Sequence, residues 1–423
     1  MKTNKYQILI LLFVIICVCL AAQEQGDYLT IKIVEIGPGD EFFSWWGHLA
    51  VMVDNELTGR SLFYDFGVFS FDDPNLVRNV LKGDLNYNII VSNAQDDLAW
   101  YKQHNQDITL YSLNLDSRQK EQIAYALNWN VQPQNSKYLY KIFTDNCVTR
   151  IMLIIDDALN GTFIEKYKNE NGRFTLRGHA GRHFYHAPLL YLFLNFIMGE
   201  EIDKPSSKYD EMYLPSELTA ALADFTYTDI NGNIQPLVSG IERINTSIGR
   251  PTVLSRPPNS WLYAFLAGMI MAIFFMLLII FQKKNRGLPH VFYISQSLIA
   301  LCWASMGTVL FYTMFFSHHS YTYNNLNILY ANPLLFTAVP MGILCAFTKQ
   351  ERKIVFYSRI LRALWTYVLI GVAVSIVLRF AGLNYTDNTF ILLLLTPSAL
   401  VLSCGAKIYA KLPTRRNHGI FHQ

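Results

Sequence analysis

The sequence predicts two units, one in water and one in the lipid bilayer. The first is an exported α+β domain, and the second is an all-α bundle of five membrane-spanning helices. Three observations lead to this prediction. A secretory signal opens the chain, strand-like patterns and then helix-like patterns follow it, and apolar stretches of membrane-spanning length occupy the last part. The length of 423 residues is enough for two folded units.

The N-terminus has the features of a secretory signal. Lys2 and Lys5 precede an apolar run at 8–20, and Ala21-Ala22-Gln23 supplies the small residues that are found before a cleavage site. We therefore expect residues 1–22 to be a signal peptide, with an uncleaved N-terminal anchor as the alternative. In both cases the chain after Gln23 is exported, and residues 24–255 are predicted to form an extracytoplasmic domain.

The sequence changes character after Pro251, where Arg256-Pro257-Pro258 forms a stiff linker. Apolar stretches then follow one another, and we expect residues 261–410 to be a transmembrane helical domain. The third stretch is the shortest. The five predicted spans lie at 261–281, 291–316, 333–347, 360–380 and 389–410.

The distribution of Lys and Arg predicts the orientation of these spans. The loops after the first and third spans and the tail at 411–423 are rich in both residues, whereas the loops at 317–330 and 382–388 contain neither. Because positive charge is enriched in cytoplasmic loops, the tail is expected in the cytoplasm and residues 24–255 outside it. Arg379 is the one exception, and its long side chain can reach the interface.

Residues 24–255 show the patterns of a mixed α/β domain. Alternating or short apolar runs predict strands at 28–36, 47–53, 61–66, 85–91 and 107–115. Asp116 with Gln119 has the spacing of a capping box and predicts a helix start. A second helix is predicted from Asp145-Asn146-Cys147, because apolar residues follow at helical spacing. This places Cys147 in the first turn.

Cys147 is the candidate nucleophile. Of six cysteines, two lie in the signal and three in apolar spans, so a disulfide inside the exported domain is excluded. At a helix N-terminus the dipole and backbone donors stabilise a thiolate, and the same donors can stabilise an oxyanion. A buried structural cysteine is the alternative. The other five cysteines are Cys17, Cys19, Cys302, Cys345 and Cys404.

The nucleophile needs a base, and His48 is the best-placed histidine. It opens a predicted strand, from which an imidazole can face a helix terminus. His104 lies in a polar stretch and is expected in solvent. Asp65 on the next strand is the candidate third residue that orients the imidazole, with Asp145 as the alternative.

A group of basic residues and histidines between Arg177 and His186 allows two interpretations. His179, His183 and His186 could suggest a metal site, but no further Cys or paired carboxylate completes a ligand set, and we predict no metal or other cofactor. Contact of Arg182 and its neighbours with phospholipid headgroups suits the apolar run at 189–198 that follows. The net charge of +3, without a basic stripe, argues against nucleic acid.

A histidine on an early strand, followed by an asparagine–cysteine pair that opens a helix, resembles the circularly permuted papain-like fold. Lecithin:retinol acyltransferase belongs to this group, and its His-then-Asn-Cys order is similar to Gly47-His48-Leu49 and Asn146-Cys147 here. The resemblance implies an enzyme that carries an acyl chain from a phospholipid on its cysteine as a thioester.

The combination of motifs and membrane spans resembles more specifically the Lnb family of lipoprotein N-acyltransferases. This resemblance implies a bacterial inner-membrane enzyme with its catalytic domain in the periplasm. It would move an acyl chain from a phospholipid to the α-amine of the lipidated N-terminal cysteine of lipoproteins. It implies catalytic roles for Cys147 and His48, with Asp65 as our candidate third residue. Our candidates for substrate binding are Trp46, Asn146, Arg150 and Arg182. The motifs are Trp46-Gly47-His48, Tyr64-Asp65-Phe66-Gly67, Asn146-Cys147, Thr149-Arg150 and Tyr213-Leu214-Pro215.

Two other functions use the same features differently. An exported papain-like cysteine peptidase or amidase that acts on peptidoglycan would use the same Cys147–His48 pair, but it needs a polar cleft and has little use for five spans. A membrane scaffold would keep Cys147 as a structural residue, and its thiol would not react with a probe in the folded protein.

Overall fold

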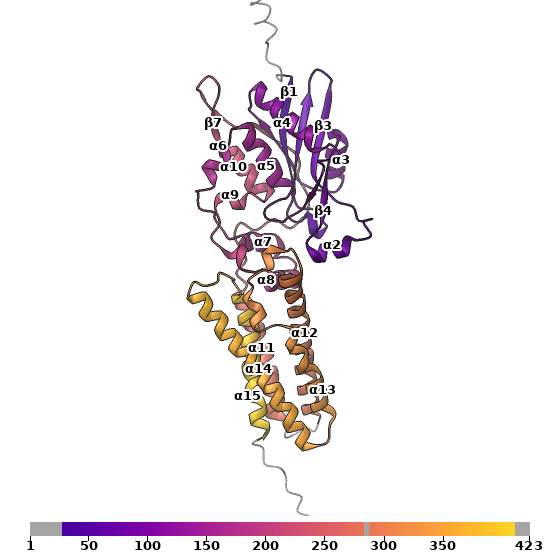
Figure 1. Cartoon of the computed structure of the whole chain (residues 1–423), viewed down its shortest axis with the longest axis vertical. Helices are drawn as coiled ribbons and strands as arrows, with labels where there is room; N and C mark the ends of the chain where they lie inside the picture. The colour runs from indigo at the N-terminus through magenta and orange to yellow at the C-terminus, as the bar shows by residue number, and fades with distance from the viewer. Residues whose placement is uncertain (1–27, 283–286, 411–423) are drawn as a thin grey trace, which may run out of the picture. The chain divides into compact units, whose positions relative to one another are not determined.

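The computed structural model describes residues 28–282 and 287–410 (Figure 1). These residues form two compact units. The first contains the chain up to Val80, Asp84–Leu176 and Pro205–Val253, and the second contains Leu81–Gly83, Arg177–Lys204 and the chain from Leu254 onward. The predicted signal peptide and cytoplasmic tail lie outside the described residues.

The first unit is built on a seven-stranded antiparallel sheet with the strand order β6-β4-β3-β2-β1-β5-β9. Its central strands bury both faces, because successive side chains point to opposite sides. Ile31 and Ile33 of β1 lie in one core, and Val34 and Ile36 in the other. The strands are β1 (Leu29–Ile36), β2 (His48–Asn55), β3 (Arg60–Val68), β4 (Asn86–Asn93), β5 (Ile108–Leu113), β6 (Lys137–Leu139) and β9 (Val238–Asn245), with a separate β7 (Thr226–Thr228) and β8 (Ile234–Pro236) pair.

Helices cover both faces of this sheet (Figure 1). The larger core lies under α4, α5 and α10, and α5 contributes Val148, Ile151, Met152 and Ile155 to it. The smaller core lies under α3. The helices of this unit are α2 (Leu76–Lys82), α3 (Ala94–Gln103), α4 (Ser117–Asn130), α5 (Cys147–Ala158), α6 (Thr162–Tyr167), α9 (Lys208–Glu211) and α10 (Pro215–Asp224), with η1 at Phe42–Ser44.

The predicted elements of this unit are confirmed. All five predicted strands form, as β1 to β5, and both predicted helices form, as α4 and α5. Asp116 and Gln119 make the reciprocal bonds of a capping box at the start of α4. The sequence analysis missed β6, β7, β8 and β9, three of which have only three residues each.

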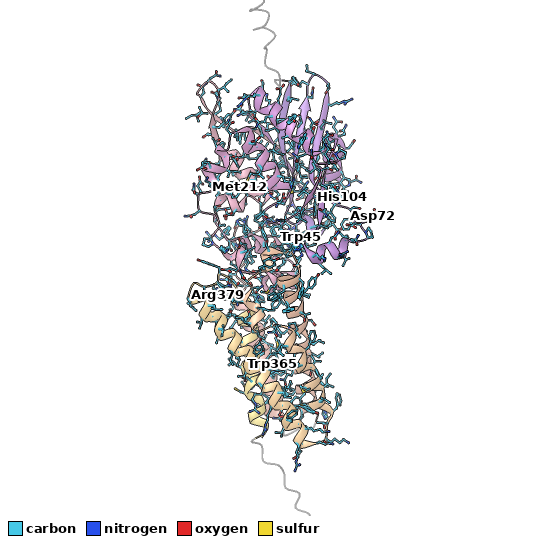
Figure 2. The ribbon with its side chains drawn as sticks, in the orientation of Figure 1. Trp45, Asp72, His104, Met212, Trp365 and Arg379 are labelled. Atoms are coloured by element: carbon cyan, nitrogen blue, oxygen red, sulfur yellow. The ribbon has the colours of Figure 1, made fainter. Side chains whose placement is uncertain are left out.

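The second unit is helical. Trp365 of α14 is fully buried inside it (Figure 2). Four of its helical segments are long and apolar enough to cross a membrane: Trp261–Phe281, Leu288–Phe316, Leu326–Phe347 and Glu351–Phe380. Its helices are α7 (Leu176–Phe184), α8 (Pro188–Ile197), α11 (Trp261–Phe281), α12 (Leu288–Phe316), α13 (Ala338–Phe347), α14 (Glu351–Phe380) and α15 (Thr389–Ala410), with η2 (Glu200–Asp203), η3 (Ser320–Thr322), η4 (Leu326–Leu329) and η5 (Pro333–Thr337).

Four of the five predicted spans are confirmed, among the described residues, as helical segments of membrane-crossing length. The fifth predicted span forms a helix, α15, whose apolar segment Thr389–Cys404 is shorter than these four. A fifth crossing by α15 stays a prediction. The third predicted span is the shortest of the five. In the structure, 3₁₀ turns extend it at its N-terminal end, and the resulting segment Leu326–Phe347 is long and apolar enough to cross a membrane.

Candidate active site

Cys147 is the first residue of α5, where backbone N–H groups of the first turn lack helical partners. The residue is only 7% exposed and belongs to the core cluster on the α5 face of the sheet. A thiolate at this position lies at the positive end of the helix dipole. The helix start therefore provides a sheltered, electropositive position for a nucleophile.

Asn146 fixes this helix start with all four of its hydrogen-bonding positions. Its Oδ1 accepts from the backbone N–H groups of Val148 and Thr149, each at 2.9 Å. Its Nδ2 donates to the carbonyl oxygens of Ile142 at 2.8 Å and Tyr213 at 2.9 Å. A carboxamide has two acceptor and two donor positions, so the side chain is fully used within the protein. Asn146 therefore positions the residue that follows it.

His48 opens β2, and its imidazole is held by Asp65 of β3. The side chains lie on neighbouring strands, where Asp65 pairs with Ala50, and they are 18% and 15% exposed. Nε2 of His48 lies 2.9 Å from Oδ1 of Asp65. Since an ionised carboxylate only accepts, Nε2 carries the proton of this bond and donates it.

The imidazole of His48 also contacts the side chain of Cys147. With Nε2 occupied by Asp65, Nδ1 is the nitrogen that can exchange a proton with the thiol. The structure thus brings together the three residues that the sequence analysis proposed as nucleophile, base and orienting group.

Gly67 leaves the space that the imidazole fills. A Cβ atom at this position would lie 2.6 Å from Cε1 of His48 and 3.1 Å from Nδ1. The backbone N–H of Gly67 also donates to Oδ1 of Asp65 at 2.7 Å. The pairing of β3 with β4 shifts register between Asp65 and Val68, as in a β-bulge, and bulges often redirect side chains at active sites. The sequence analysis quoted Gly67 in a motif without giving it this role.

His48 and Asp65 each stabilise the charged form of the other. Burial by itself lowers the pKa of His48, but the charge of Asp65 and the hydrogen bond to it hold that pKa well above the usual 6.5. Burial by itself raises the pKa of Asp65, but the charge of His48 and hydrogen bonds from His48 and Gly67 lower it below 3.8. Near neutral pH, therefore, His48 is an imidazolium and Asp65 a carboxylate.

Tyrosines surround this pair, and the sequence analysis did not identify them. The ring of Tyr101 on α3 lies 6.4 Å from that of His48, and burial raises the pKa of Tyr101 to about 12. Tyr138 belongs to the core cluster that contains Cys147, and Tyr87 and Tyr140 pack against it. Their hydroxyls stay neutral because burial raises each pKa. Tyr138 and Tyr140 lie in and directly after the three-residue β6, which has no sequence signal of its own.

Two further residues predicted for the site, Arg150 and Trp46, contact other side chains of the first unit. Arg150 bonds both carboxylate oxygens of Asp145, at 2.6 and 3.0 Å, and its guanidinium lies 3.8 Å from the ring centroid of Tyr138. Asp145, the alternative third residue, is thus engaged with Arg150. The ring of Trp46 lies 5.9 Å from that of Tyr213, whose carbonyl receives the bond from Asn146.

Arg182 belongs to the second unit, where it is 7% exposed. Its Nε donates to the carbonyl of Leu254 at 2.6 Å, and one of its terminal nitrogens lies 2.8 Å from Nδ1 of His179. Arg177 is also buried and forms an ion pair with Asp203 at 2.6 Å. Substrate binding by Arg182 stays a prediction. In the described part of the chain, no group of three or more His, Cys, Asp or Glu side chains could hold a metal ion.

Replacing Asn146 with alanine should destabilise the first unit by about 2–4 kcal/mol, because it removes a helix cap and leaves the buried carbonyl of Tyr213 and the half-buried carbonyl of Ile142 without their donor. Thermal unfolding of the full-length protein in detergent would measure the loss. The matched control is Asn93→Ala, since Asn93 caps α3 with one bond, to the N–H of Gln95. The control should cost about 1 kcal/mol. Equal losses would contradict the bonding described for Asn146.

Replacing Asp65 with asparagine should move the alkaline limit of thiol reactivity to lower pH. The charge of Asp65 raises the pKa of His48, so its removal lets the imidazolium lose its proton at lower pH. The native charged pair persists from below pH 3.8 to above pH 6.5, since the pKa of Asp65 is lowered and that of His48 raised. The measurement is the rate of Cys147 alkylation by the anion iodoacetate against pH, because this reagent reacts fastest while the neighbouring imidazolium attracts it. An unchanged alkaline limit would show that Asp65 does not set the charge of His48.

Comparison with known proteins identifies part of the chain. Residues 20–172 match the family model described as the Lnb N-terminal periplasmic domain. The matched segment contains His48, Asp65 and Cys147, and it ends before α9 and α10. No curated protein and no solved structure matched the chain.

Proposed function

This chain carries an Lnb N-terminal periplasmic domain followed by four long apolar helices, and from this premise we propose that it is a membrane-bound lipoprotein N-acyltransferase. One observation carries the proposal: a buried thiol at a helix N-terminus contacts an imidazole that a carboxylate orients. A nucleophile and base in contact, with a third group that orients the base, form the arrangement used for covalent acyl transfer.

We propose that the first unit is a circularly permuted papain-like domain. Two features support this assignment: the base, His48, lies on a strand of an antiparallel sheet and comes first in the chain, and the nucleophile, Cys147, opens a helix that packs on that sheet. The proposed site is on the periplasmic side of the bacterial inner membrane. The donor is a membrane phospholipid, and the acceptor is the lipidated N-terminus of a lipoprotein.

The first half-reaction starts from the pair in which Nδ1 of the His48 imidazolium holds the proton and Cys147 is the thiolate. The thiolate attacks the carbonyl carbon of a phospholipid ester, and a tetrahedral oxyanion forms. Asn146 occupies the N–H groups of Val148 and Thr149, so the N–H of Cys147 itself is the amide beside the sulfur that can stabilise this oxyanion. The imidazolium then protonates the leaving alkoxide, a lysophospholipid departs, and an acyl thioester remains on Cys147.

In the second half-reaction, the α-amine of the lipoprotein cysteine attacks the thioester. Free α-amines have a pKa of about 8, so a fraction is neutral and nucleophilic near neutral pH. His48 takes a proton from the amine as the carbon–nitrogen bond forms, and the carbon–sulfur bond then breaks. The products are an amide and the regenerated Cys147–His48 pair. Because the donor is a lipid and the acceptor is lipidated, membrane helices keep the enzyme in the same bilayer as both substrates.

Intact-mass analysis tests this proposal directly. The purified full-length protein is mixed with phospholipid micelles without an acceptor amine. We expect a mass gain of one fatty acyl chain, which hydroxylamine removes because it cleaves thioesters. A hydrolase of cell-wall peptides, the alternative that uses the same pair of residues, would form no adduct from phospholipid and would cleave a peptidoglycan peptide instead. Absence of the adduct in a folded, thiol-reactive protein would reject the acyltransferase.

A further inference from the structure

A row of aromatic rings runs from the core cluster that contains Cys147 to the surface of the first unit. Tyr140 stacks on Tyr87 with ring centroids 4.1 Å apart, and Tyr87 lies 5.0 Å from Phe69. Phe69 in turn lies 4.7 Å from Phe71 and 5.6 Å from Phe43. We call these five residues the aromatic row. They come from three segments that are far apart in the sequence: the η1 turn, the end of β3 with its loop, and the β4–β6 edge of the sheet.

The two ends of the aromatic row have different environments. At the inner end, Tyr87 and Tyr140 pack against the core cluster that contains Cys147. At the outer end, Phe43 is 44% and Phe71 65% exposed. Their neighbour along the chain, Phe42, is 55% exposed. The rings thus pass without a break from the core cluster that contains Cys147 to solvent.

Clustered exposed aromatic residues normally mark a binding surface, since burying them is favourable. The three phenylalanines of the aromatic row offer ring faces and no hydrogen-bonding group, which suits an aliphatic chain. A peptide would also need partners for its backbone N–H and C=O groups. The chain that bears this surface continues into membrane-length helices from Trp261 onward, so lipid is the apolar molecule always within reach.

We propose that the aromatic row binds one acyl chain of a membrane phospholipid and so places the ester of that chain at Cys147. The reaction at Cys147 rests on the proposed function. The binding surface and its ligand are inferred from the contacts between the rings and from the exposure of the outer rings. The chain would lie with its ester beside Tyr87 and Tyr140 and with its methyl end toward Phe43 and Phe71. The row would then favour long acyl chains over short ones.

Photocrosslinking tests the binding without requiring catalysis. The full-length Cys147→Ala protein is placed in nanodiscs that contain phosphatidylethanolamine with a diazirine at the end of one acyl chain. After irradiation, peptide mass spectrometry should find label in the segments that carry Phe43 and Phe71, in addition to the membrane helices. Label confined to the membrane helices would overturn the proposal.

Variants of the outer rings separate this role from a structural one. Phe43→Ser/Phe71→Ser should remove most of the label from these segments, whereas Phe43→Leu/Phe71→Leu should keep it because leucine is still apolar. The control is Tyr125→Ser, since Tyr125 is 70% exposed on α4 and outside the row. Equal labelling in the serine and control variants would contradict the proposal.

Acylation rates then distinguish failure of the binding surface from failure of the reaction. In the protein with native Cys147, the serine variant should form the thioester from dipalmitoyl-phosphatidylethanolamine about tenfold more slowly, the effect of losing burial of roughly two methylene groups. Its rate with the dihexanoyl lipid should not change. If the protein is labelled on the aromatic row but forms no thioester with either lipid, the binding surface is confirmed and the acyltransferase proposal is rejected. Equal slowing with both lipids would overturn the acyl-chain role.

Discussion

Replacing Cys147 with alanine should reduce acyl transfer to a lipoprotein N-terminus by at least about 10⁴-fold, since loss of a nucleophile removes the covalent pathway altogether. The fold should survive, because the thiol is small and the helix start is held by Asn146. The measurement is mass spectrometry of a reporter lipoprotein, incubated with full-length enzyme and isotopically labelled phospholipid in proteoliposomes.

A second thiol provides the control for this experiment. Cys302 lies on α12 and is exposed, so Cys302→Ala should leave the transfer rate unchanged. If Cys147→Ala retained more than a few per cent of the native rate, the nucleophile would lie elsewhere. Cys147→Ser should be almost as inactive, because a hydroxyl is a far weaker nucleophile than a thiol at the same position.

Adding one methyl group at Gly67 should reduce the reaction by at least about 100-fold, the usual effect of displacing a catalytic group by about 1 Å. An alanine Cβ would lie 2.6 Å from Cε1 of His48, so the imidazole must shift away from its position. Nε2 would then lose its short contact with Asp65, and Nδ1 its alignment with the thiol. The measurement is the rate of thioester formation from phospholipid, followed by intact mass.

Gly240 is the matched control for this substitution. It lies on β9 of the same sheet, and a Cβ there meets no atom within 4 Å. Gly240→Ala should therefore keep the native rate. Circular dichroism of both variants should match that of the native protein, which shows that the effect of Gly67→Ala is local. Native activity in a folded Gly67→Ala protein would mean that the position of His48 is not critical.

Much of the first unit could be predicted from the sequence because its signals are local. The capping box of Asp116 and Gln119 and the apolar spacing after Cys147 each depend on neighbours within one or two helical turns. The strands that carry His48 and Asp65 were found in the same way, from alternation along each strand. Candidate residues on these elements followed from chemistry alone.

Features that depend on distant partners were not predicted. β6 is only three residues long and exists because it pairs with β4. The carbonyl of Tyr213 bonds Asn146 across 67 positions of the chain. Arg177 and Arg182 were expected at phospholipid headgroups, yet both are buried in their unit, and Arg177 finds its partner, Asp203, 26 positions away. The sequence alone does not indicate whether a charged side chain is solvated or forms an ion pair with another side chain.

The bond from Asn146 to Tyr213 has a consequence for the order of events during export. Asn146 sets the helix start that presents the thiol, but one of its four partners belongs to the segment Pro205–Val253. That segment leaves the translocation machinery only after the whole region up to residue 172, which matches the periplasmic family model, has already crossed. A partly exported chain would therefore have both Cys147 and His48 outside the cytoplasm before the cap is complete. Alignment of the Cys147 thiol is thus coupled to synthesis of the residues that lead into the membrane helices.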